Sequence, residues 1–190
     1  MTFRFGTREC CMSHILYKSS AAGSWRSLAL LLRYNPSAKE EQTMDALELL
    51  KQDHAKVKDL LEKAESAEGK ERSSVFEKIK TELETHARIE ENVFYPAVQK
   101  NEELKDMVLE SIEEHKQVKT LLREMDNLSK DSEKFEPKLK VLKENVEHHA
   151  EEEEEGKMFP KVRKLFSASE LQELGAELEA AKGNRERKAG

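Results

Sequence analysis

The sequence predicts an all-α protein: an up-down-up-down antiparallel four-helix bundle with a short extra C-terminal helix and a flexible N-terminal extension. The 190-residue chain has only 7 Gly and 4 Pro, and 38% of its residues are charged, a composition typical of helices. Residues 45–100 also resemble residues 103–165, which indicates two repeated helical hairpins. Because neither hairpin can bury its own apolar stripe, we expect the two to close into one bundle.

Residues 1–43 differ in composition from the rest of the chain. Residues 1–39 carry a net charge of +5, so the remaining residues carry −11 of the total of −6. A basic, acid-poor start is typical of an organellar transit peptide. A disordered extension, or a start upstream of an initiator at Met44, is the alternative. The expected location is therefore the cytoplasm, or a mitochondrion or plastid if this stretch is a transit peptide.

The composition also argues against several function classes. The acidic body does not suit nucleic acid as a partner. The longest apolar run, residues 28–32, is too short to span a membrane. Both cysteines, Cys10 and Cys11, lie in the extension, so the body has no cysteine-based zinc site. No pattern in the sequence indicates an oligomeric state.

Caps and prolines set the expected helix limits. Asp45 followed by Glu48 is typical of a helix N-terminus. Pro96 and Pro160 are expected to kink or stop the second and fourth helices, whereas Pro137 fits the first turn of the fourth. The expected helices are about residues 45–68, 71–96, 102–129, 132–160 and 167–181. The expected domains are residues 1–43 (extension), 44–166 (bundle) and 167–190 (short helix and tail).

Two histidine–glutamate motifs stand out in the second and fourth helices. His86 is followed four residues later by Glu90, and His149 by Glu153, and an aromatic residue and a proline follow each motif. Residues at i and i+4 lie on one helix face, one turn apart. Two such pairs could therefore offer two imidazoles and two carboxylates to a metal between the helices.

Four histidines are expected to meet at one level of the bundle. With a rise of about 1.5 Å per residue, each lies roughly 21–26 Å from the turns that join its helix to the next. A single histidine on an apolar face is usually a satisfied core residue. Unpaired buried glutamates are costly and repel each other, however, and a pair of metal ions removes both problems. The predicted ligands are His54, His86, His115 and His149 with Glu90 and Glu153.

The donor types narrow the choice of metal. Imidazole and carboxylate ligands without thiolates suit iron, manganese or zinc, and two carboxylates that can bridge favour a dinuclear centre. The Glu-x-x-His pattern of ferritin-like bundles is absent, which argues against a ferritin-like assembly.

Taken together, the histidine on the first helix, the histidine on the third and the two His-x-x-x-Glu motifs resemble the hemerythrin-like HHE cation-binding domain over about residues 45–165. The resemblance implies a cofactor of two non-haem iron ions with an oxo or hydroxo bridge. It implies a partner that is O2 or another small diatomic or anionic ligand. In the residues of this chain, one iron would be held by His54 and His86, the other by His115 and His149, and both by the bridging Glu90 and Glu153.

Two points of the ligand set stay open. Oxygen-carrying hemerythrins have a second histidine one turn after that of the third helix, where this sequence has Lys119; water or His148 could fill the position. The acidic run 151–155 also offers Glu152 and Glu154 in place of Glu153, and His148 with Glu152 is a self-consistent alternative pair. His149 and Glu153 are preferred because they continue the apolar stripe of their helix.

The expected function is small-ligand binding, sensing or iron handling by a metal-binding protein rather than an enzyme. A di-iron enzyme acting on peroxide or nitric oxide is the first alternative, and an acidic structural bundle with adventitious metal is the second. The expected approach to the metals is lined by apolar side chains, namely Leu50, Val57, Leu83, Val118, Leu122 and Val146.

Overall fold

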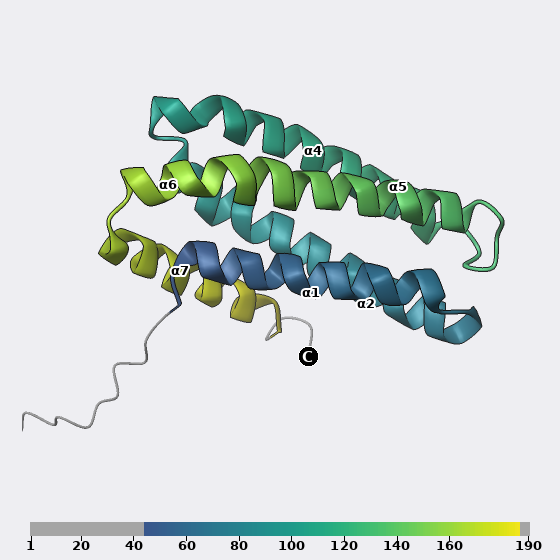
Figure 1. Cartoon of the computed structure of the whole chain (residues 1–190). Coiled ribbons are helices and arrows are strands. Elements are labelled where there is room, and N and C mark those ends of the chain that lie inside the picture. Colours follow the sequence, from purple (N-terminus) through teal and green to yellow (C-terminus); the bar gives the residue numbers. More distant parts are fainter. Residues whose placement is uncertain (1–43, 187–190) are drawn as a thin grey trace, which may run out of the picture. The chain divides into compact units, whose positions relative to one another are not determined.

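The computed structural model describes residues 44–186, which form an antiparallel helical bundle with one further helix at the C-terminal end (Figure 1). The elements are α1 (Ala46–Ser66), α2 (Gly69–Ile89), the π-helical segment η1 (Glu90–Phe94), α3 (Tyr95–Val98), α4 (Glu102–Asp126), α5 (Phe135–Glu147), the π-helical segment η2 (His148–Met158), α6 (Phe159–Leu165) and α7 (Ala168–Glu186). The predicted fold class is confirmed. The extension expected at residues 1–43 lies outside the described residues.

Helix ends follow the expected capping chemistry. Asp45 Oδ1 accepts the N–H groups of Leu47 and Glu48 at 3.0 and 3.1 Å, which satisfies two free donors of the first turn of α1. Ser167 and Glu170 form a reciprocal capping box at the start of α7. That helix continues to Glu186, beyond the end expected near residue 181. None of the helices between residues 44 and 186 is long and apolar enough to cross a membrane.

The two prolines of the repeat follow π-helical segments. Each π segment ends two residues before a proline, and its last turn closes with a bond over five residues: Tyr95 N–H to the Glu90 carbonyl, and Phe159 N–H to the Glu154 carbonyl. The helical runs therefore continue past Pro96 and Pro160 as α3 and α6. π segments inside helices are frequent at functional sites, and these two coincide with the predicted ligands.

A polar layer divides the bundle core into two apolar clusters. One cluster includes Leu50, Val108 and Phe159 and extends to the α7 end of the bundle, and the other includes Val57, Phe76 and Leu122. Along every bundle helix the buried histidine falls between residues of the two clusters. The buried polar side chains of this layer are His54, His86, Glu90, His115, His149 and Glu154.

α7 covers the half of the bundle that α1 and α2 form. It packs against α1, η1 and α2 and buries Leu171, Leu174 and Leu178. A Cβ atom at Gly175 would lie 2.0 Å from the carbonyl oxygen of Met44, so the close packing of α7 on the start of α1 requires glycine at this position. α7 thus lies directly over the helices that carry the first two predicted ligands.

Candidate metal centre

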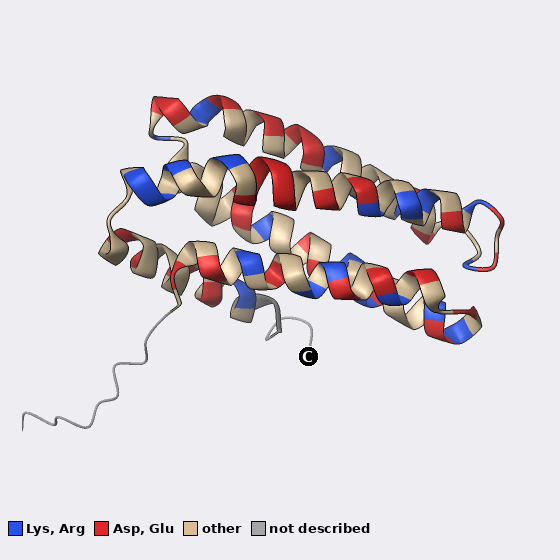
Figure 2. Ribbon diagram, viewed as in Figure 1, with Lys and Arg blue, Asp and Glu red and all other residues tan. Residues whose placement is uncertain are grey.

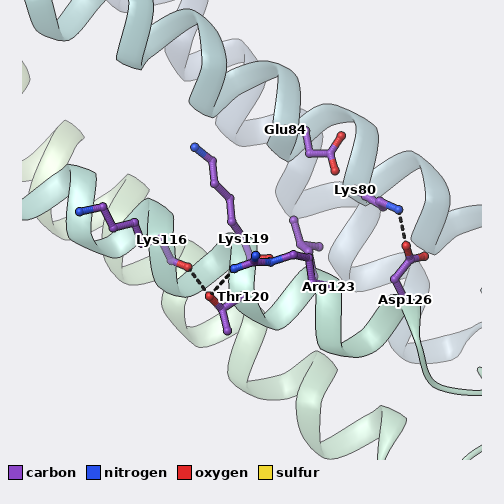
Figure 3. A pocket seen from close by; sticks show the side chains of 8 residues that line it. Lys80, Glu84, Lys116, Lys119, Thr120, Arg123 and Asp126 are labelled. Atoms are coloured by element: carbon purple, nitrogen blue, oxygen red, sulfur yellow. Dashed lines mark hydrogen bonds and ion pairs between the residues drawn. The ribbon is translucent and has the colours of Figure 1, made fainter.

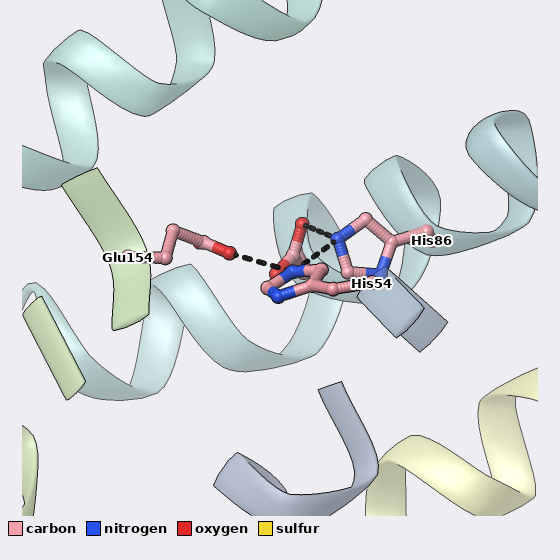
Figure 4. Close-up of side chains that lie close together, drawn as sticks. His54, His86 and Glu154 are labelled. Carbon is pink, nitrogen blue, oxygen red and sulfur yellow. Dashed lines mark hydrogen bonds and ion pairs between the residues drawn. The ribbon is translucent and has the colours of Figure 1, made fainter. Parts of the chain in front are cut away.

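Four histidines converge in the polar layer as two pairs. The Nε2 atoms of His54 and His86 lie 3.2 Å apart, and those of His115 and His149 lie 3.1 Å apart. Figure 4 shows His54 and His86 pointing toward one another and Glu154 approaching His54 from η2. Two nitrogens that share one ion at roughly 2.1 Å each lie roughly 3 Å apart. Both pairs therefore have the spacing of two ligands on one ion.

Two buried carboxylates join the histidine pairs. Glu90 Oε2 lies 3.0 Å from His86 Nε2 and 3.3 Å from His115 Nε2. Glu154 Oε2 lies 3.1 Å from His54 Nε2 and 3.7 Å from His149 Nε2. Each carboxylate thus contacts one histidine of each pair, which is the arrangement that a bridging ligand requires.

The register of the fourth helix differs from the preferred sequence prediction. Because η2 begins at His148, the chain needs five residues rather than four to return to the face of His149. Glu154, the less favoured candidate, therefore enters the polar layer. Glu153 is buried but turns its Oε1 to Lys157, one turn further along the segment.

The other predicted candidates lie outside the cluster. His148 has a side chain that is 49% exposed, and its Nδ1 lies 3.1 Å from Glu152 at the surface. The alternative pair of His148 and Glu152 thus forms, but away from the polar layer. Lys119 Nζ contacts Glu91 rather than any of the clustered imidazoles.

Buried carboxylate oxygens without partners indicate what the cluster can bind. Glu90 and Glu154 are fully buried, yet no hydrogen bond reaches either oxygen of Glu90 or Oε2 of Glu154. These oxygens lie close to imidazole nitrogens without the geometry of a hydrogen bond, because the side chains point to a common centre. Buried carboxylates are stable only beside a positive charge, and a metal ion at that centre would supply it. The donor set and its geometry therefore fit metal ions.

The electrostatics of the metal-free chain also favour a cation. Burial lowers the pKa of His54, but the close contacts with the Glu154 and Glu155 carboxylates outweigh burial and raise the pKa to about 10. Burial likewise lowers the pKa of His115, and contacts with Glu90 and Glu91 raise it to about 9. The carboxylates thus hold protons on these imidazoles, and a metal ion would replace those protons.

A ring of outer carboxylates faces the second nitrogen of each histidine. The contacts run from each helix to the next and close on the first. The Nδ1–carboxylate distances are 3.6 Å for His86 and Asp53, 3.0 Å for His115 and Glu91, 2.7 Å for His149 and Glu114, and 2.7 Å for His54 and Glu155. The first is too long for a hydrogen bond. Such outer carboxylates orient metal-binding imidazoles and increase their basicity.

Lysines hold two of these outer carboxylates in place. Lys182 of α7 lies 2.5 Å from Asp53, and Lys119 of α4 lies 2.5 Å from Glu91. The histidine and the lysine beside Glu91 together lower its pKa to about 2. α7 is therefore connected to the histidine cluster through Lys182, Asp53 and His86.

Tyr95 adds a phenol that the sequence prediction did not include. It is buried, and its O–H donates to Glu154 Oε1 at 2.9 Å. A difference between the two motifs indicated this hydroxyl: the residue before the proline is tyrosine in the first motif and phenylalanine, Phe159, in the second. The sequence also indicated the outer carboxylates, because each of them directly precedes or follows a candidate ligand in the chain.

A small cavity lies on one side of the cluster. Its volume is about 20 Å³, enough for the centre of a water-sized molecule. Apolar side chains and all four histidines line it, as do Ala87, Lys119 and Ala150. The apolar residues include five of the six predicted ones: Val57, Leu83, Val118, Leu122 and Val146. The sixth, Leu50, belongs to the apolar cluster on the opposite side of the histidine layer.

The family model of the hemerythrin HHE cation-binding domain matches residues 45–162. The chain belongs to this family. The resemblance drawn from the sequence is thereby confirmed. The buried histidine and glutamate cluster, which is able to bind metal, lies where the four bundle helices meet.

Two relatives of this HHE domain differ in how much of their length it covers. The crystal structure of an HHE cation-binding domain-containing protein from Mycobacterium kansasii superposes with a TM-score of 0.66, at 30% identity, over 76% of this chain and 91% of that chain. A protein described as a DNA nickase, from Nostoc sp., is 27% identical over 152 residues, which are 80% of this chain and 43% of the relative. The chain thus spans less than half of that curated relative.

Proposed function

We propose that this HHE domain, residues 44–166, binds two iron ions and that the di-iron centre binds O2 or another small diatomic or anionic ligand. The observation that carries the proposal is the division of the cluster into two histidine pairs, each joined to the other by Glu90 and Glu154. Mixed imidazole and carboxylate ligands suit iron. When bound, iron supplies reversible ligand binding and electron transfer.

The chain supplies ligands in two sets. His54 and His86 would hold one ion and His115 and His149 the other, in agreement with the pairing that the resemblance implied. Glu90 and Glu154 would lie between the ions. The outer carboxylates keep each imidazole oriented with Nε2 toward the centre, because their oxygens face Nδ1.

Tyr95 positions one of the two shared carboxylates. Its hydroxyl donates to Glu154 Oε1, which leaves Oε2 directed at the imidazoles of His54 and His149. This contact fixes the rotation of the carboxylate. An alanine or phenylalanine at position 95 would release it.

The cavity limits what can reach the centre. Its volume of about 20 Å³ and its apolar walls exclude bulk water and large ligands. The space has room for about one water-sized molecule, which favours the smallest ligands. The wall residues belong to four different helices, so the cavity depends on the closed bundle.

Metal content of the full chain tests the proposal. After expression in iron-supplemented medium and aerobic purification, elemental analysis should give about two irons per chain. Near-ultraviolet charge-transfer bands should change on addition of azide. His54→Ala and His115→Ala should each lose iron, whereas His148→Ala, which alters an exposed histidine, should not. Iron below one per chain, or equal iron in all four proteins, would contradict the proposal.

A di-iron enzyme acting on peroxide or nitric oxide is the second candidate function. The observation that favours it is the unequal donor set: four residues, His54, His86, Glu90 and Glu154, can surround one ion, and three surround the other. Lys119 does not complete the second set, because it binds Glu91. Turnover of hydrogen peroxide or nitric oxide by the iron-loaded chain would identify the enzyme, and stoichiometric binding without turnover would identify the ligand-binding protein.

A further inference from the structure

We propose that small anions reach the metal centre through a positively charged cleft between α2 and α4, and that Lys119 at the inner end of this cleft admits them. This inference rests on the proposed function, because it names the ligand class and the access route of the same centre. Four observations support it: the charge of the cleft, its shared wall with the metal cavity, the opposite charge of the other adjacent cleft, and the position of Lys119.

The cleft is a basic surface on an acidic protein. Its volume is about 660 Å³. Figure 3 shows Lys80 and Glu84 of α2 facing the side chains that α4 contributes. Four cationic side chains and two carboxylates give the lining a net charge of +2. The lining residues are Lys80, Glu84, Lys116, Lys119, Thr120, Leu122, Arg123 and Asp126.

The cleft and the metal cavity share a wall. Lys119 and Leu122 line both. Leu122 is buried, whereas the Lys119 side chain is 37% exposed. A ligand that crosses from the cleft to the imidazoles must therefore pass these two side chains. Within the described residues, Lys119 is the only lysine or arginine that lines the cavity.

A second cleft also borders the cavity but carries the opposite charge. Its volume is about 440 Å³, and it lies between α1 and the run of α5 and η2. Three glutamates outnumber two lysines in its lining, which gives a net charge of −1. The glutamates belong to the acidic stretch that Figure 2 shows as a red band along η2 and the end of α5. The charged lining residues are Lys51, Lys58, Glu147, Glu151 and Glu155. This side therefore attracts anions less than the first cleft does.

Lys119 is placed to exchange one carboxylate for another anion. Its Nζ lies 2.5 Å from Glu91 Oε1, and Glu91 retains a contact with His115 Nδ1 at 3.0 Å. The lysine side chain has a flexible four-carbon stem with a compact charge. The ammonium group can therefore turn from Glu91 to an incoming anion while the second carboxylate contact keeps Glu91 on His115.

The size of the inner cavity restricts the anion. A volume of about 20 Å³ has room for about one water-sized molecule, so the cavity selects the smallest anions. The class is therefore small monovalent anions, for which azide is the experimental probe. Larger anions can enter the outer cleft but not the cavity.

Rapid-mixing kinetics of azide binding to the iron-loaded full chain test the route. Lys119→Gln should slow azide association roughly 5- to 10-fold, at or just below the lower end of electrostatic steering effects, because only one of the four cations is removed. The wild-type rate should fall with added salt, and less so in the variant. Association of the neutral ligand nitric oxide with the reduced chain should not change. Lys119→Arg should restore most of the azide rate.

Lys58→Gln is the matched control. Lys58 also pairs with a glutamate, Glu151, at 2.6 Å, and lines the second cleft. This variant should keep the wild-type azide rate. Equal slowing by both variants, or no slowing by Lys119→Gln, would overturn the proposed route. Slowing of azide and nitric oxide alike would also overturn it, because the effect would then be steric.

The outcomes separate this inference from the proposed function. If the wild-type chain holds no iron, the proposed function fails. If it holds iron and binds azide, but at a rate that salt does not lower, the inference alone fails. The salt dependence also decides the case if Lys119→Gln loses iron through the loss of its contact with Glu91, because that measurement needs only the wild-type chain.

Discussion

Glu154 Oε2 lies 3.1 Å from His54 Nε2, although the two residues come from the first and the last helices of the bundle. Glu154 also accepts the Tyr95 hydroxyl through its other oxygen. The carboxylate is therefore fixed on both sides in a fully buried position. Its neighbour Glu153 points to Lys157 instead, and the difference between these two glutamates can be tested directly.

Glu154→Gln should lower the iron content of the chain to one ion or less, because it removes the negative charge that the two histidine pairs share. Glu153→Gln is the matched control and should leave two ions, since this side chain contacts a lysine outside the cluster. Elemental analysis of the two purified variants is the measurement. Loss of iron in Glu153→Gln with retention in Glu154→Gln would show instead that Glu153 is the ligand, as α-helical spacing predicts.

Gly156 lies in the π segment η2 at a position where a side chain would meet the backbone. A Cβ atom there would lie 2.9 Å from the Glu151 carbonyl oxygen, closer than side chains tolerate. The clash should cost roughly 1–3 kcal/mol, partly offset by the ~1 kcal/mol higher helix propensity of alanine. Gly156→Ala should therefore lower both the melting temperature and the affinity for metal.

Gly183→Ala is the control for that variant. No atom lies within 4 Å of a Cβ at this position in α7, so the substitution should leave the protein unchanged or raise its melting temperature. Thermal unfolding of the two variants gives the comparison. Equal stabilisation by both substitutions would show that η2 does not need glycine.

Lys182 supports the first histidine pair from outside the bundle. Lys182→Met leaves Asp53 without its cation beside His86. Metal binding should weaken, by less than the ~10- to 100-fold typical for loss of the outer carboxylate itself. Lys143→Met breaks a surface ion pair with Glu65 and should leave the affinity unchanged. Calorimetric titration of Fe(II) into metal-free protein under anaerobic conditions would measure both. Equal Fe(II) affinities of Lys182→Met and Lys143→Met would show that the contact from α7 does not support metal binding.

The metal-free chain should lose stability as the pH rises. The pKa of His54 is raised to about 10 and that of His115 to about 9, above the value of ~6.5 expected for unfolded histidine. Their protonation therefore stabilises the fold fully below pH ~6.5, and this contribution disappears as the pH rises through about 9 and 10. Denaturant midpoints of the metal-free chain should fall across this range.

Metal loading changes that pH dependence. Imidazoles bind metal in their neutral form, so loading at pH 7.5 should release at least about two protons, from His54 and His115. An indicator dye in weakly buffered solution counts them. The loaded chain should also lack the loss of stability between pH 7 and pH 9. Release of no protons would contradict the raised pKa values and the assignment of these histidines as ligands.

The sequence predicted the fold and the histidine positions because both depend on regular helix geometry. The apolar periodicity and the internal repeat determine which faces meet, and a constant rise per residue brings His54, His86, His115 and His149 to one level. The same reasoning selected Glu90, because η1 begins only at that residue and the chain before it is α-helical.

The remaining features depend on departures from that geometry. Glu154 replaced Glu153 because η2 changes the spacing, and nothing in an α-helical count predicts a π segment of eleven residues. The outer carboxylates were not predicted either, because each of them faces the histidine of a neighbouring helix rather than the candidate ligand next to it in the sequence. Asp53 directly precedes His54, yet it faces His86.

The most direct test of the central claim is anomalous diffraction at the iron absorption edge from crystals of the iron-loaded full chain. The account predicts two peaks, one next to His54 and His86 and one next to His115 and His149, with Glu90 and Glu154 contacting both. A single peak, peaks elsewhere on the protein, or a peak contacted by Glu153 instead of Glu154 would contradict it.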